Sequence, residues 1–195
     1  MSNINDKDIY HIYFKLCDSN LITENERMML IEYQKQTMTE KSTSIFIRSL
    51  CLLNDPDLEE FIQPYLDRVD MPNVASDALI CLCRLGLAQK YRGDIMKMLR
   101  SDYPDDKRFR IVGAAITCIG LYLHEHPDQE FSQIIRQFIS RTDDPLLRSA
   151  RDNYSIISAR MAASVAMGAD PAVVVDDVAS MNEYIARFLA ERGHG

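Results

Sequence analysis

The stretch DKRFRIVGAAITCIGL at residues 106–121 decides the fold of this chain. It opens on an acidic turn, continues through apolar residues, and places small side chains at Gly113, Ala114 and Ala115. Signals for β-strands are weak here and throughout the chain. The stretch therefore predicts a helix over 107–123, and its small residues indicate a face on which a neighbouring helix packs closely.

The same pattern returns earlier in the chain at the spacing of a helical hairpin. Residues 73–87 carry two alanines and end in a Leu-Gly-Leu sequence whose Gly86 precedes Gly120 by 34 residues. Prolines, which favour the first turn of a helix, stand between the apolar stretches. The spacing predicts four helix pairs: 42–53 with 56–69, 73–87 with 91–102, 107–123 with 127–140, and 145–167 with 171–191.

Residues 1–40 precede these pairs and predict N-terminal helices. Apolar residues at helical spacing indicate one helix over 6–17. Thr23 with Glu26 three residues later forms a capping-box pattern, which opens a second helix. The predicted fold class is all-α, a right-handed α-solenoid of about four helical hairpins plus these N-terminal helices.

On these residues the chain resembles HEAT-repeat proteins. Residues 106–121 are similar to the acidic turn, arginine, alanine pair and late glycine of the family's first helix. Residues 74–87 echo that motif, and Asp144 to Ala150 echo its opening only. The pair 42–53 with 56–69 lacks the alanines. The resemblance covers about residues 42–191 and implies a stacked helical fold that binds other macromolecules.

Composition predicts one ordered domain over 1–195 in a reducing compartment. Hydrophobic residues make up 47% of the 195 residues, which is enough for a core. The chain has only 7 Gly and 7 Pro, too few of these helix-breaking residues for a loop-rich protein. No apolar run spans a bilayer, and the polar N-terminus lacks the design of a signal peptide, so we expect a cytoplasmic protein with no membrane partner. Five cysteines, an odd number, favour reduced thiols over a disulfide framework.

No set of residues has the sequence pattern of an active site, so we expect no catalytic residues, no cofactor, no metal and no enzymatic activity. His124-Glu125-His126 is a short cluster of residue types that bind metals. Zinc would need a further ligand that the nearby sequence does not supply, and a polar helix end explains these residues. Basic residues gather at 107–110 and at four arginines between 141 and 160. Interleaved aspartates and the net acidity disfavour nucleic acid as a partner.

The negative charge is uneven along the chain and predicts the kind of partner. Net charge is −7, and residues 1–72 hold 13 Asp and Glu against 7 Lys and Arg, which gives −6 for the first third. Such a surface suits a basic protein, whose approach it accelerates, although acidic residues also serve simply to keep proteins in solution. The predicted partner-binding residues are Asp55, Asp57, Glu59, Glu60 and Asp67.

In size, acidity and helical pattern the chain also resembles immunity proteins of bacterial toxin systems, such as contact-dependent inhibition and other polymorphic toxins. The resemblance implies a protein that neutralises a cognate toxin, typically a basic nuclease, by direct binding. Two alternatives remain open: a HEAT-like scaffold or adaptor in a larger assembly, and a HEAT-like nucleic-acid enzyme.

Overall fold

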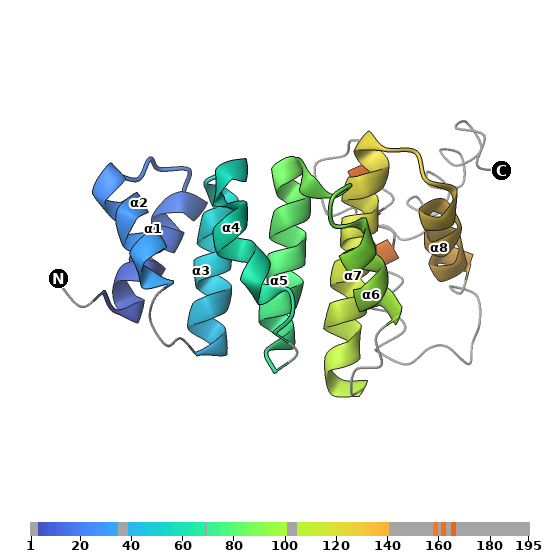
Figure 1. The fold of residues 1–195 in the computed structure, drawn as a ribbon, viewed down its shortest axis with the longest axis horizontal. Coiled ribbons are helices and arrows are strands. Elements are labelled where there is room, and N and C mark those ends of the chain that lie inside the picture. Colours follow the sequence, from blue (N-terminus) through green and yellow to red (C-terminus); the bar gives the residue numbers. More distant parts are fainter. Residues whose placement is uncertain are drawn as a thin grey trace. The chain divides into compact units, whose positions relative to one another are not determined.

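The computed structural model describes residues 4–34, 39–68, 70–100 and 105–140, together with 158–159, 161–162 and 165–166 (Figure 1). Across these residues the regular structure is helical, without a strand, which confirms the predicted all-α class. The chain divides into two compact units, Met1–Leu87 and Ala88–Gly195, which are described separately here. Stacking of the helices into one right-handed solenoid domain stays a prediction.

The first two helices begin where their capping residues stand. α1 (Asp6–Cys17) starts after Asn5, whose side chain accepts from the backbone N–H of Lys7 and Asp8. α2 (Glu24–Tyr33) starts after Thr23, and the Glu26 carboxylate accepts from the Thr23 N–H at 2.7 Å. The second contact completes the predicted capping box. Both predicted N-terminal helices are thus confirmed.

α3 (Glu40–Leu52) is followed by a segment that is less regular than the sequence suggested. A single helix over 56–69 was predicted, and this is wrong. The segment consists of η1 (Pro56–Leu58), the short α4 (Glu59–Ile62) and η2 (Gln63–Tyr65). Pro64 is the physical reason, because it has no backbone N–H to donate and its ring crowds the preceding turn of an α-helix.

The first unit ends in α5 (Pro72–Leu82) and a π-helical turn, η3 (Cys83–Leu87). The helix predicted over 73–87 is continuous, but it changes from α to π geometry after Leu82. Gly86 has a φ of 78°, in the left-handed region that glycine adopts without steric cost. The late glycine of this motif therefore stands where the helical backbone conformation ends.

The core of the first unit is centred on Phe46. α3 packs against both α1 and α5, which places this ring in the interior, where it is completely buried. Its centroid lies 6.2 Å from that of Tyr33 on α2 and 6.1 Å from that of Tyr65 on η2. One aromatic side chain thus joins three helical segments of the unit.

The second unit contains α6 (Arg92–Arg100), α7 (Asp105–Glu125) and α8 (Gln129–Ser140). Their bounds confirm the predicted helices 91–102, 107–123 and 127–140 to within two residues. The predicted helix over 145–167 is described only at 158–159, 161–162 and 165–166, which are helical, and 171–191 lies outside the described residues.

α7 makes the close contact that its small residues predicted. A Cβ placed on Gly120 would lie 2.3 Å from the backbone oxygen of Ala162 and 2.6 Å from its Cα. Only a residue without a side chain fits there, because real Cβ contacts are not that short. Ala159 and Ala162 are completely buried, as expected for a small-residue helix face.

Candidate functional site

Asp55, one of the predicted partner-binding residues, forms contacts within the fold. Its carboxylate caps η1 by accepting from the Asp57 N–H at 3.0 Å, and it forms an ion pair with Arg27 of α2. Hydrogen bonding from Arg27 holds the pKa of Asp55 below its usual range. Asp55 therefore ties α2 to the segment that follows α3.

The other predicted residues lie along that segment. Asp57, Glu60 and Asp67 are exposed, and Glu59 is half-buried. Within the described part of the chain, the carboxylates of Asp57 and Glu60 form no ion pair. These two carry negative charge that the fold itself does not neutralise.

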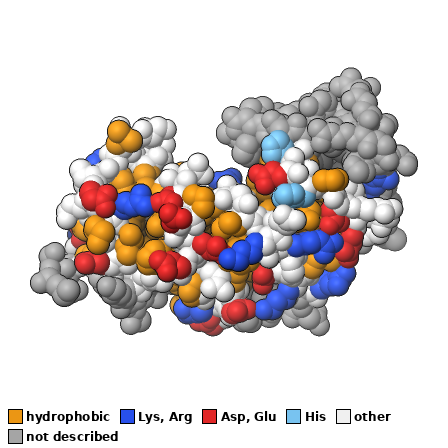
Figure 2. Space-filling view, turned by 45° about the horizontal axis from the view of Figure 1, so that its top comes forward, with side chains coloured by type: hydrophobic (Ala, Val, Ile, Leu, Met, Phe, Trp, Pro, Cys, Tyr) orange, Lys and Arg blue, Asp and Glu red, His pale blue; other side chains and the backbone are white. Residues whose placement is uncertain are grey.

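α2 adds acidic and apolar groups beside this segment, since the Arg27–Asp55 ion pair joins the two. Glu24 and Glu32 are exposed on α2, and Met28 keeps 46% of its surface exposed. Figure 2 shows acidic side chains among apolar ones over the N-terminal helices. We name this region the acidic surface; it comprises Glu24, Glu32, Asp57, Glu60 and Asp67.

Nearby cations are largely occupied by partners within the unit. Lys15 binds the Glu26 carboxylate at 2.9 Å, and Arg68 binds Asp70 at 2.7 Å. Hydrogen bonds from the Thr23 backbone and from Lys15 lower the pKa of Glu26 to about 2. These pairs cancel charge locally and leave the acidic surface negative.

A second polar cluster joins α3 to α5. Asp77 accepts from Ser44 and forms two contacts of 3.1 Å with the Arg48 guanidinium. One turn further along both helices, the thiols of Cys51 and Cys81 are hydrogen-bonded to each other, with Arg84 beside them.

This thiol pair was not predicted from the sequence, although the positions of the two cysteines carry a signal for it. Cys51 and Cys81 are each the penultimate residue of α3 and α5. Equivalent positions in successive hairpins lie side by side when their first helices pack together. Spacing along the chain could not reveal the pair, because its two members stand on different helices.

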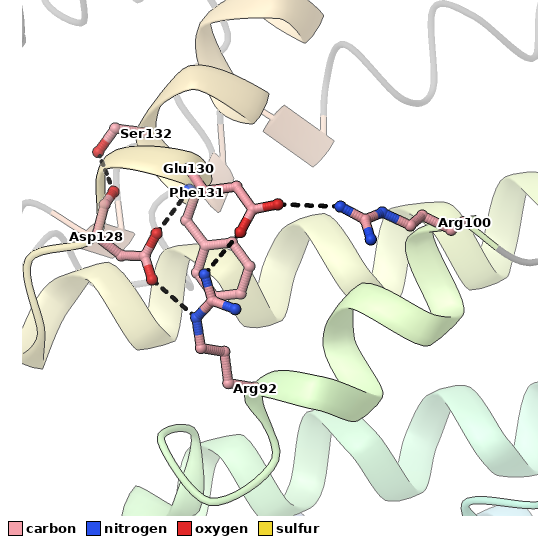
Figure 3. A network of polar contacts seen from close by, with 6 residues as sticks. All are labelled: Arg92, Arg100, Asp128, Glu130, Phe131 and Ser132. Atoms are coloured by element: carbon pink, nitrogen blue, oxygen red, sulfur yellow. Dashed lines mark hydrogen bonds and ion pairs between the residues drawn. The ribbon is translucent and has the colours of Figure 1, made fainter.

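The second unit holds a closed network around Arg92 (Figure 3). Its guanidinium contacts Asp128 and Glu130, each at 2.8 Å, and lies 4.7 Å from the centre of the Phe131 ring. Arg100 reaches Glu130 at 3.0 Å. The hydrogen bonds that Arg92 donates to Asp128 and Glu130 raise the pKa of Arg92. Through these contacts both arginines connect α6 to the start of α8.

The remaining candidates from the sequence are the histidines at the end of α7 and the basic residues. His124 and Glu125 are exposed at the end of α7. The His126 imidazole lies 3.8 Å from the Glu125 carboxylate, and its ring is tilted by 57° against that of Tyr122. Among the residues that the structure describes, no three His, Cys, Asp or Glu side chains come together as metal ligands. Arg110 is exposed, and the basic positions at 141, 148, 151 and 160 lie outside the described residues.

No helix in the described ranges combines the length and apolar character that a membrane crossing requires. Comparisons with protein-family models, with curated proteins and with solved structures find no match for this chain.

Proposed function

We propose that this chain is a protein-binding module of HEAT-like helical repeats that acts as an immunity protein, neutralising a basic toxin domain by direct binding. The acidic surface is the observation that carries the proposal. Its carboxylates come from two segments that the Arg27–Asp55 ion pair holds together, which supports a common binding face. A basic cleft of a nuclease has the complementary charge.

The distribution of paired and unpaired charges in the first unit supports binding through this face. Lys15, Arg27 and Arg68 are each paired with a carboxylate of the same unit, whereas Asp57 and Glu60 are exposed. Exposed, unpaired charges act on a partner over roughly one Debye length, about 8 Å at physiological salt. Such charges mainly raise the association rate.

The repeat-like character of the proposal is supported by the second unit. The Gly120 backbone approaches that of Ala162 so closely that no side chain fits between them. Successive first helices of a HEAT-like array need such contacts, which small residues permit.

The test uses the domain encoded at the end of the gene adjacent to this one, co-expressed with the chain in a growth assay. In parallel, association of the two purified proteins is followed by stopped flow at several salt concentrations. The variant is Asp57→Asn with Glu60→Gln, which removes two charges and leaves the Arg27–Asp55 tie intact. The control is Asp94→Asn with Glu125→Gln, an equal charge change in the second unit.

We expect the Asp57/Glu60 variant to associate about threefold to tenfold more slowly and to protect less well, while the control behaves as the parent. Added salt should reduce the difference between variant and parent. Equal association rates for both variants would refute the acidic surface as the binding face. Tight binding to a neighbour-encoded protein that is not toxic would favour the scaffold function instead.

A further inference from the structure

The first unit contains a dithiol built from two adjacent helices. Cys51 lies near the end of α3 and Cys81 near the end of α5, and these helices pack directly against each other. Asp77 of α5 contacts Ser44 and Arg48 of α3, and one turn further along both helices Cys81 and Cys51 stand at the same helix–helix contact. This placement is the first requirement for a disulfide, because cysteines whose side chains point apart cannot be bridged without backbone movement.

The two thiols have different surroundings, which assigns them different roles. Cys51 is half-exposed, so a small oxidant can reach it, whereas Cys81 is 1% exposed. The hydrogen bond from Cys81, followed by the nearby Arg84 cation, lowers the pKa of Cys51 below its usual range, against the opposing effects of burial and of Asp77. The same hydrogen bond and burial raise the pKa of Cys81. Cys51 is therefore the nucleophile, and Cys81 is the thiol that resolves its oxidised form.

The other cysteines lack this combination. Cys17 is exposed, but its contact is the Tyr13 hydroxyl rather than a second thiol. Cys83 and Cys118 are buried. Within the described residues, only the pair on α3 and α5 brings an accessible sulfur and a second thiol together.

We propose that Cys51 and Cys81 form a peroxide-sensitive dithiol that closes to an intramolecular disulfide between α3 and α5. The Cys51 thiolate attacks one oxygen of hydrogen peroxide and breaks the O–O bond, giving a sulfenic acid and hydroxide, which takes up the proton released by Cys51. The Cys81 sulfur then attacks the sulfenic sulfur. The S–S bond forms, the S–O bond breaks, and water leaves with the Cys81 proton. Two thiols and one peroxide become one disulfide and two waters.

This modification site is independent of the proposed protein-binding function. The disulfide would link the first helices of two consecutive predicted hairpins and close a long loop of the first unit. Such a cross-link restricts the unfolded chain, and we expect it to raise the apparent Tm by about 5–10 °C.

The test treats the full-length chain with one equivalent of hydrogen peroxide and follows its mass and its remaining free thiols. Cleavage after Arg48, Arg68 and Arg84 releases peptides 49–68, with Cys51, and 69–84, with both Cys81 and Cys83. Cys83→Ser is therefore the matched control, since it leaves Cys81 as the single thiol of its peptide. The loss variants are Cys51→Ser and Cys81→Ala, each checked for its helical content.

We expect the parent and Cys83→Ser to lose two hydrogens and to yield peptide 49–68 cross-linked to 69–84. Cys51→Ser should give no cross-link, and Cys81→Ala should accumulate a sulfenic acid at Cys51 that a dimedone probe traps. A cross-link that survives Cys51→Ser or disappears in Cys83→Ser would overturn the assignment. So would a parent protein that reacts first at the exposed Cys17.

A measurement on the parent alone covers the case in which a variant fails to fold. The rate of Cys51 alkylation by iodoacetamide should level off at a lower pH than expected for an ordinary cysteine, because Cys81 and Arg84 favour its thiolate. A rate that still rises steeply above about pH 9 would contradict an activated Cys51.

Discussion

The contact between Gly120 and Ala162 gives the sharpest test of how α7 packs. Gly120→Ala adds one methyl group, which would lie 2.3 Å, 2.6 Å and 2.7 Å from the backbone O, Cα and C of Ala162. Ordinary contacts need about 3.5 Å, so the two segments must separate by about 1 Å. Overpacking against backbone costs about 1–3 kcal/mol, whereas alanine in place of glycine within a helix contributes about 1 kcal/mol. We expect a net loss of up to about 2 kcal/mol.

Gly93→Ala is the matched control in the same unit. A Cβ at Gly93 on α6 meets nothing within 4 Å, so the substitution brings the helix-propensity gain without a clash. We expect it to stabilise the protein by about 0.5 kcal/mol. The assay is urea unfolding followed by far-ultraviolet circular dichroism, with the midpoints of both variants compared with the parent. A Gly120→Ala variant as stable as Gly93→Ala would refute the close packing.

Three further changes test other contacts. Phe46→Ala should cost about 3–5 kcal/mol in urea unfolding, because it empties a completely buried aromatic site; a loss below about 1 kcal/mol would contradict its central place. Glu26 has a depressed folded pKa of about 2, so it stabilises the fold above its unfolded pKa, and this contribution falls away between about pH 5 and pH 2. Glu26→Gln should flatten that part of the stability–pH curve, and an unchanged curve would exclude Glu26, with its contacts to Thr23 and Lys15, as the source. Arg92→Ala should cost about 1–2 kcal/mol by breaking the ion pair to Asp128, and Arg92→Lys should restore only part of it.

The sequence predicted best those helices whose boundaries are set by neighbouring residues. α1 and α2 begin at the side chains that satisfy their first N–H groups, and such caps act within three residues. α6, α7 and α8 follow from apolar periodicity and intervening turns. The segment after α3 was predicted poorly because periodicity was given more weight than Pro64, whose missing N–H interrupts the helix.

Features of the candidate site were harder to predict, because they depend on contacts between distant residues. The pairing of Asp55 with Arg27 spans 28 positions and turns a predicted binding residue into a structural tie. The Cys51–Cys81 contact requires knowing that α3 and α5 pack in register. Charge along the chain, by contrast, is read directly from composition, so the acidic character of the first third needed no structure.

The buried tyrosine beside Phe46 gives the protein a useful optical property. The chain has 9 Tyr and no Trp, so its near-ultraviolet absorbance and emission come mainly from tyrosine. Burial, with the hydrogen bond that the Tyr33 hydroxyl donates to Asp6, raises the pKa of Tyr33 to about 12. In an alkaline titration this phenol should ionise above the ordinary range for tyrosine. Loss of that late step would report unfolding around Tyr33 in the first unit, without an added label.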